Sequence, residues 1–225
     1  MQKELKLPTL AAICLTLMAN SPRLMAEELI YVVESFKGPV SVVEAGQTKA
    51  RAAEEEDVLD AGDEIRTGAL AEATLTLNAN TSVHLGANSK LKVAQLAPNT
   101  TGGFFSKLKL LAGKVVSKVE KLAMTRSSFS VDAGSVSAGV RGTLFEVGIS
   151  GEDEVETSAE EGEVEVASGS EKQVLGAGRL MAFRAGKRFA ERKLEAKEHE
   201  RFKGFVAGHA RVAAPPPPPP PPNGH

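Results

Sequence analysis

Short segments in which hydrophobic and polar residues alternate dominate the chain between residues 30 and 183. Period-two alternation places every second side chain on one face, which is typical of β-strands with one buried side. Gly, Asn, Asp and Ser separate the segments, and helical spacing is poor throughout. Examples are Ala73–Leu77, Ser82–Leu85, Lys90–Val93, Lys107–Leu111, Phe129–Val131 and Glu163–Val166. The pattern predicts an all-β domain of about a dozen or more short strands.

Glycines that precede these strands recur at nearly regular distances. Glycine adopts the positive φ of a sharp turn at little cost. The series is Gly38, Gly62, Gly86, Gly113, Gly139 and Gly162, with intervals of 24, 24, 27, 26 and 23 residues. Such intervals suit the coils of a β-solenoid. The predicted fold is a solenoid-like or jelly-roll-like stack of short strands, with a conventional β-sandwich as the alternative.

Beyond residue 184 the spacing of hydrophobic residues becomes helical. One face collects Phe189, Ala190, Leu194, Phe202, Phe205 and Val206, with charged residues opposite. This predicts a C-terminal amphipathic helix over residues 185–212, whose stripe packs on the β domain; membrane-surface or partner-helix binding is the alternative. The tail, residues 213–225, contains Pro215–Pro222, an extended polyproline rod suited to a spacer or docking segment.

The first 26 residues have the pattern of a secretory signal peptide. Lys3 and Lys6 precede the apolar run Leu7–Ala19, and Ala26 ends a suitable cleavage site. The run is short for a membrane span, which needs about 20 residues, so membrane contact is expected only if the signal stays uncleaved. The sole cysteine, Cys14, lies in this segment. The mature chain is therefore expected to be periplasmic or secreted, with no thiol chemistry and no disulfide.

Composition removes several classes of function. The net charge of -2 over 225 residues gives no argument for nucleic acid, and the absence of Trp with a single Tyr leaves little material for base stacking or a sugar platform. Nucleophile-elbow, phosphate-loop and zinc-protease motifs are absent from the sequence. We expect no catalytic residue, cofactor or metal, and a glycosidase-like pair of acids is the remaining enzymatic option.

Three motifs follow one another in a specific order along the chain: G-D-x-I-x-T-G at Gly62–Gly68, V-R-G-T-x-F at Val140–Phe145 and an E-G-x-V strand at Glu161–Val164. This order resembles the FecR-type domain, the periplasmic regulator domain of ferric-citrate signalling systems. The resemblance covers about Ile30 to Phe183. The family's domain is β-rich and solenoid-like, which agrees with the glycine spacing.

The resemblance implies a regulatory role. In the family's regulators a cytoplasmic segment binds a sigma factor, a membrane helix follows, and the periplasmic part senses an outer-membrane transporter. Here residues 27–184 are expected to form the FecR-like domain without the cytoplasmic segment. The expected function is an exported, non-enzymatic module that binds a protein partner in the bacterial cell envelope. The alternative is a surface polysaccharide or peptidoglycan binder, with or without weak glycan-cleaving activity.

Two glycine turns contain the candidate site residues. In the first, Arg141 stands between Gly139 and Gly142, which supply a tight backbone, and Thr143 begins the next strand. We expect the guanidinium of Arg141 to cap carbonyls of stacked turns, with ligand contact as the alternative.

The second turn holds Asp60, Asp63 and Thr67. Two carboxylates could bind Ca²⁺, but no EF-hand-like continuation follows them. We therefore expect Asp63 to cap the turn, with Thr67 completing it.

Overall fold

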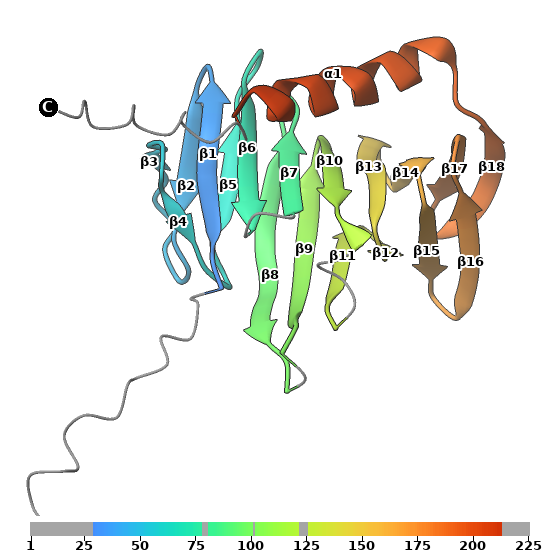
Figure 1. Cartoon of the computed structure of the whole chain (residues 1–225), viewed down its shortest axis with the longest axis horizontal. Helices are drawn as coiled ribbons and strands as arrows, with labels where there is room; N and C mark the ends of the chain where they lie inside the picture. The colour runs from blue at the N-terminus through green and yellow to red at the C-terminus, as the bar shows by residue number, and fades with distance from the viewer. Residues whose placement is uncertain (1–28, 78–80, 101, 122–125, 213–225) are drawn as a thin grey trace, which may run out of the picture.

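The computed structural model describes residues 29–77, 81–100, 102–121 and 126–212 (Figure 1). The predicted signal peptide and the proline-rich tail lie outside the described residues. Within them, the prediction of a mostly β domain is confirmed, because the chain forms two nine-stranded sheets and a helix.

The two sheets are called A and B. Sheet A contains, in spatial order, β18 (Lys187–Lys193), β17 (Arg179–Arg184), β14 (Glu154–Glu161), β13 (Thr143–Gly151), β10 (Lys114–Val119), β7 (Thr81–Leu85), β6 (Glu72–Leu77), β1 (Tyr31–Lys37) and β4 (Val58–Leu59). Sheet B contains β16 (Glu171–Gly176), β15 (Glu163–Ser168), β12 (Val136–Val140), β11 (Ser128–Ala133), β9 (Phe104–Ala112), β8 (Lys90–Pro98), β5 (Glu64–Thr67), β2 (Val40–Val43) and β3 (Arg51–Ala52).

The chain builds both sheets together by placing one strand or a hairpin in one sheet and then crossing to the other. Hairpin β6–β7 belongs to sheet A, β8–β9 to sheet B, and β13–β14 to sheet A again. Among the described strand pairs, only β9 and β11 run parallel. Successive coils of a solenoid would pair in parallel, so the regular glycine spacing has another origin.

That origin lies mostly in the corners between the sheets. Five of them, Gly38, Gly62, Gly86, Gly113 and Gly162, stand where the chain leaves one sheet for the other, whereas Gly139 lies inside β12. The chain also changes sheet after β3, β5, β10, β12 and β16, where no glycine of the series stands. The series therefore marks some of the crossings between the sheets rather than successive coils.

The sheets pack face to face around one apolar core. Alternation produces it: in β9 the buried residues Phe104, Ser106, Leu108 and Leu110 are separated by exposed ones. Residues from both sheets join in a single buried cluster. The hydroxyls of Tyr31 on sheet A and Ser106 on sheet B lie 2.7 Å apart within it, so a buried hydrogen bond links the two layers.

The C-terminal helix begins later than predicted. Residues 187–193 form β18, and α1 spans Ala196–Val212, so Phe189 and Ala190 lie on a strand. Pairing of β18 with β17 explains the difference, since a hairpin partner outweighs weak helical spacing. The helix starts where Glu198 accepts a 2.7 Å hydrogen bond from the backbone N–H of Glu195, as in a capping box.

The apolar stripe of α1 covers the outer face of sheet A. Figure 1 shows the helix crossing over the strands of this sheet. Phe202 and Phe205 on α1 join a second apolar cluster with Val116, Leu144 and Leu180 of the sheet. The prediction that the stripe packs on the β domain is confirmed.

Among the described residues, no helix has the length and apolar character needed to cross a membrane.

Candidate functional site

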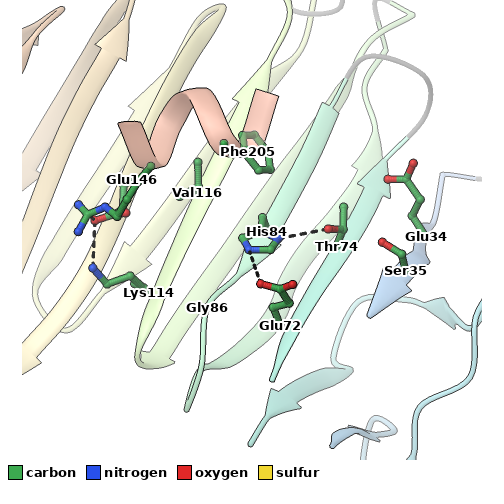
Figure 2. Close-up of a pocket in the computed structure, with 12 residues that line it drawn as sticks. Glu34, Ser35, Glu72, Thr74, His84, Gly86, Lys114, Val116, Glu146 and Phe205 are labelled. Carbon is green, nitrogen blue, oxygen red and sulfur yellow. Dashed lines mark hydrogen bonds and ion pairs between the residues drawn. The ribbon is translucent and has the colours of Figure 1, made fainter. Parts of the chain in front are cut away.

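A cavity of about 510 Å³ lies between α1 and the outer face of sheet A (Figure 2). Small-molecule sites typically have volumes of about 300 to 1,000 Å³. Its wall comes from β1, β6, β7, β10 and β13 on one side and from Arg201, Gly204 and Phe205 of α1 on the other. The cavity therefore exists only where the helix and the sheet meet.

One row of cross-strand neighbours forms the floor. Ser35, Thr74, His84, Val116 and Glu146 lie directly opposite one another on β1, β6, β7, β10 and β13. Since adjacent strands are about 4.8 Å apart, the row is about 19 Å long. Five segments distant in the sequence thus present one continuous line of side chains.

His84 occupies the middle of this row and is held by neighbours on several sides. Its Nδ1 lies 3.2 Å from Oγ1 of Thr74, and its Nε2 lies 4.0 Å from the carboxylate of Glu72. The ring of Phe205 is tilted against it, with ring centroids 5.7 Å apart. The imidazole is thus fixed by the sheet below and by the helix above.

Glu146 connects the sheet to the helix through two cations. Its side chain is 10% exposed, and its Oε1 accepts hydrogen bonds from Nζ of Lys114 at 3.3 Å and from Nη2 of Arg201 at 3.1 Å. A buried carboxylate needs such partners because its charge loses hydration. Gly86 makes room for this arrangement, since a Cβ there would lie 3.1 Å from Cγ of Lys114.

A second ion pair fixes the beginning of α1. Nη1 and Nη2 of Arg192 donate to the two carboxylate oxygens of Glu198 at 2.7 and 2.9 Å. These bonds, with the backbone N–H of Glu195, lower the pKa of Glu198 from its usual 4.5 to about 2. Farther along the helix, Nδ1 of His199 lies 2.5 Å from Glu160.

The predicted turn residues lie elsewhere and have structural surroundings. Arg141 is exposed at the bend between β12 and β13, and its guanidinium makes no side-chain hydrogen bond to a described residue, contrary to the expected capping role. Gly142 has φ of 72°, and a Cβ there would lie 2.8 Å from Cα of Lys121. Thr143 is buried at the start of β13, and Gly139 pairs with Glu165.

In the other turn, the expected capping is confirmed. The two carboxylate oxygens of Asp63 accept hydrogen bonds from the backbone N–H groups of Ala45 at 2.7 Å and Asp60 at 2.9 Å. Oγ1 of Thr67 donates to the carbonyl of Gly86 at 2.6 Å and accepts from the N–H of Ser89 at 2.9 Å. Within the described ranges, no three His, Asp or Glu side chains are grouped so as to hold a metal ion.

The cavity residues were missed at the sequence level. Each polar member that comes from the sheet stands at an outward position of its strand, as His84 does in β7 and Glu146 does in β13. Such positions are usually solvated, so nothing local distinguishes them. Only the cross-strand register and the path of α1 bring them together.

Fold and site together define a class of protein: a two-sheet β domain with one face closed by a helix over a polar cavity. Residues 63–165 of the chain match the FecR protein family. The resemblance seen in the motifs is therefore confirmed for that segment. The match includes cavity residues from Glu72 to Glu146, whereas Glu34 on β1 and the residues of α1 lie outside it.

Similarity to a solved structure gives the fold further support. The chain is similar to a crystal structure of a candidate anti-sigma factor from Parabacteroides distasonis ATCC 8503, with 17% identity and a TM-score of 0.52 over 64% of this chain. It spans 65% of that protein's length. A second such structure from the same organism has 20% identity, covers 60% of this chain and 61% of its own, and has a TM-score of 0.49. No curated protein matches the chain.

Proposed function

We propose that the protein is an exported, non-enzymatic FecR-type module that binds a protein partner in the bacterial cell envelope and regulates signalling. The family match over residues 63–165 supports a regulatory role. The fold shared with a candidate anti-sigma factor agrees with it. The edge strands of the two sheets indicate where a partner would bind.

The observation that carries this proposal is that the outermost strands at the two ends of the sheets differ in length. At one end of the two sheets the outermost strands, β3 and β4, have two residues each. At the other end the outermost strands are β16 and β18, with six and seven residues. A long outer strand presents unpaired backbone groups to which a partner strand can add.

The two outermost strands β16 and β18, here called the long edge, have exposed side chains that suit a protein contact. Val174 on β16 is 63% exposed, and Phe189 on β18 is 49% exposed. The guanidinium of Arg184 stacks 4.6 Å above the ring of Phe189. Apolar groups beside charges on an accessible backbone are the usual components of an interface. Scarce aromatic residues argue against the alternative of a sugar platform.

Site-specific crosslinking in intact cells tests this proposal. A photoreactive residue replaces Val174 on the long edge or, as the control, Leu70, which is 92% exposed near the other end. We expect one defined protein adduct from position 174 and none from position 70. Equal adducts from both positions, or recovery with glycan only, would overturn the proposal.

Export needs its own test, because the predicted signal lies outside the described residues. We expect the protein in the periplasmic or secreted fraction, with a mature N-terminus at Glu27 determined by mass spectrometry. Recovery in the cytoplasm with residue 1 or 2 at its N-terminus would refute export and leave the protein-binding proposal to be tested separately.

A further inference from the structure

The outer face of sheet B gathers positive charge on two neighbouring strands. The outward side chains of β8 and β9 include four lysines, here called the lysine patch: Lys90, Lys92, Lys107 and Lys109. Lys92 and Lys109 lie directly opposite each other in the register of the two strands. Like charges in that position oppose strand pairing, so the patch does not serve to hold the sheet together.

The acidic side chains beside the lysine patch do not neutralise it. On β5, the carboxylate of Glu64 accepts a 2.5 Å hydrogen bond from Arg66, and on β11, Asp132 lies 3.9 Å from Lys107. The other three lysines make no ion pair with another residue in the described ranges. Four lysines and Arg66 thus stand against two carboxylates, which gives these four strands a formal outward charge of +3.

Two exposed apolar side chains accompany the lysines on β9. Phe105 is 46% exposed and Leu111 is 41% exposed, and they occupy outward positions on either side of the two lysines of this strand. Figure 1 shows β8 and β9 extending beyond the strands beside them, at the end of β9 that holds Phe105. Positive charge and apolar surface therefore share one face over about 20 Å of strand.

This combination fits the surface of a membrane that contains anionic lipids. Lysines near such a surface are attracted to its phosphate groups, and each strengthens binding about fivefold. Aromatic and aliphatic side chains add to this by entering the boundary between headgroups and acyl chains. A soluble acidic polymer presents charge but offers no apolar layer to Phe105 and Leu111, so the observations favour lipid.

We propose that the outer face of sheet B rests on an anionic lipid surface, with the lysine patch against phosphate headgroups and with Phe105 and Leu111 in the headgroup–acyl boundary. The folded domain makes this contact itself, whatever becomes of the predicted signal peptide. The contact goes beyond the proposed partner binding at the long edge and does not depend on it.

Other charges on the same face give the bound domain an orientation. On β15, Glu163 and Glu165 occupy outward positions, and Lys172 on β16 pairs with Glu165 at 3.0 Å. β15 and β16 lie at the end of sheet B, separated from β9 by β12 and β11. An anionic surface attracts the lysine patch and repels Glu163. The domain would therefore tilt, and β16 would stay accessible to a protein partner.

Sedimentation of the whole chain with lipid vesicles tests the proposal. Vesicles of phosphatidylglycerol mixed with phosphatidylcholine are compared with vesicles of phosphatidylcholine alone. We expect the chain to bind the anionic vesicles at least about tenfold more tightly. This preference should largely disappear at 1 M salt, where the Debye length falls to about 3 Å.

A double variant assigns the charge to the lysine patch. Lys92→Gln/Lys109→Gln should weaken binding to the anionic vesicles by about 20- to 30-fold, at about fivefold for each lysine. Lys37→Gln/Lys197→Gln is the matched control, because it removes the same charge from exposed positions on β1 and α1. We expect the control to bind like the wild type, and both double variants to melt like it.

A second pair of variants assigns the apolar contribution. Phe105→Ser should weaken binding to the anionic vesicles at least about fivefold, because it removes apolar surface that enters the boundary. Val58 on β4 of sheet A has the same exposed fraction, 46%, so Val58→Ser is the control and should bind like the wild type. The N-terminal apolar run is common to all variants, so the differences between them report the folded domain.

The proposal is overturned if Lys92→Gln/Lys109→Gln binds the anionic vesicles like the wild type, or if 1 M salt leaves the binding unchanged. Soluble polyglutamate is titrated as a further probe. If it binds as tightly as the vesicles do and Phe105→Ser has no effect, the lysine patch binds an acidic polymer instead of lipid. Each of these failures would leave the crosslinking result at the long edge untouched.

Discussion

The outer faces of the two sheets differ although their inner faces are alike. Both inner faces contribute to one apolar core. On the outer face of sheet A, Val116, Leu144 and Leu180 are buried under α1, whereas on the outer face of sheet B, Lys107 and Lys109 are exposed. Hydrophobic and polar residues alternate along the strands of both sheets. The chemical character of the outward-facing side chains therefore decides whether an outer face is buried under another element.

The ion pairs follow the same division. Under the helix, Glu146 is bonded to both Lys114 and Arg201. On sheet B, Lys107 lies 3.9 Å from Asp132, with 47% of its side chain exposed. An exposed pair of that length contributes little to stability. The covered face therefore combines apolar burial with fixed charges, and the cavity lies where the two meet.

The largest expected effect comes from truncating Phe202, the side chain that packs α1 on sheet A. Phe202 is 1% exposed between α1 and sheet A. Phe202→Ala should lower the free energy of unfolding by about 3 to 5 kcal/mol, because it removes a large buried ring and leaves a cavity. Chemical denaturation measures the loss, and hydrogen exchange shows whether α1 is released first.

Phe189→Ala is the matched control, since Phe189 is 49% exposed on β18. We expect it to lower the free energy of unfolding by less than about 1 kcal/mol. Equal losses for the two variants would show that α1 does not stabilise sheet A.

The next effect concerns a corner shared by the two sheets. Gly142 joins β12 of sheet B to β13 of sheet A with φ of 72°. Gly142→Ala should cost about 2 to 3 kcal/mol, since a left-handed residue with a Cβ is strained and this Cβ approaches Cα of Lys121. Thermal or chemical unfolding measures it.

Gly169 provides the control for this corner. It has φ of 59°, but a Cβ there would meet nothing within 4 Å. Gly169→Ala should cost about 1 kcal/mol, the conformational part alone. If the two variants unfold alike, close packing at the corner contributes nothing.

Local patterns predicted much of this fold. Alternation in Glu72–Leu77 and Phe104–Ala112 identifies strands because the signal lies within each segment. It does not reveal pairing: β9 pairs with β11 in parallel and with β8 in antiparallel fashion. The start of α1 was misplaced for the same reason, since β18 is defined by its partner β17.

The candidate site was harder to predict than the fold. The capping role of Asp63 was found because its partners, Ala45 and Asp60, lie near it in the chain. Arg141 stands in a specific motif, yet its side chain is exposed. The pairing of Glu146 with Arg201 depends on where α1 crosses the sheet, which no local pattern contains.

A smaller effect is expected from removing the charge of Glu198, which fixes the beginning of α1. The side chain of Glu198 is 8% exposed, and Arg192 holds its pKa at about 2. A lowered pKa stabilises the folded state above the unfolded value of about 4.5, and this contribution is lost as the pH falls from 4.5 toward 2. Glu198→Gln should cost about 1 to 2 kcal/mol at pH 7, allowing for the exposure of Arg192.

Unfolding of wild type and Glu198→Gln between pH 7 and pH 2 measures this contribution. The difference should stay constant down to about pH 5 and then shrink toward zero near pH 2. Glu200→Gln is the control, because Glu200 is exposed beside Lys203, and it should unfold like the wild type at neutral pH. A difference that does not change with pH would exclude the ion pair as the cause.

The smallest effect is expected on the bare face. Lys109 is exposed on β9 and makes no ion pair with another described residue, so Lys109→Ala should change the free energy of unfolding by less than about 0.5 kcal/mol. The measurement is repeated over a hundredfold range of protein concentration. A loss above about 1 kcal/mol that grows with concentration would mean that another molecule of the chain covers sheet B in solution. Both outer faces would then be covered, one by α1 and the other by association, and the contrast between them would hold only for the isolated chain.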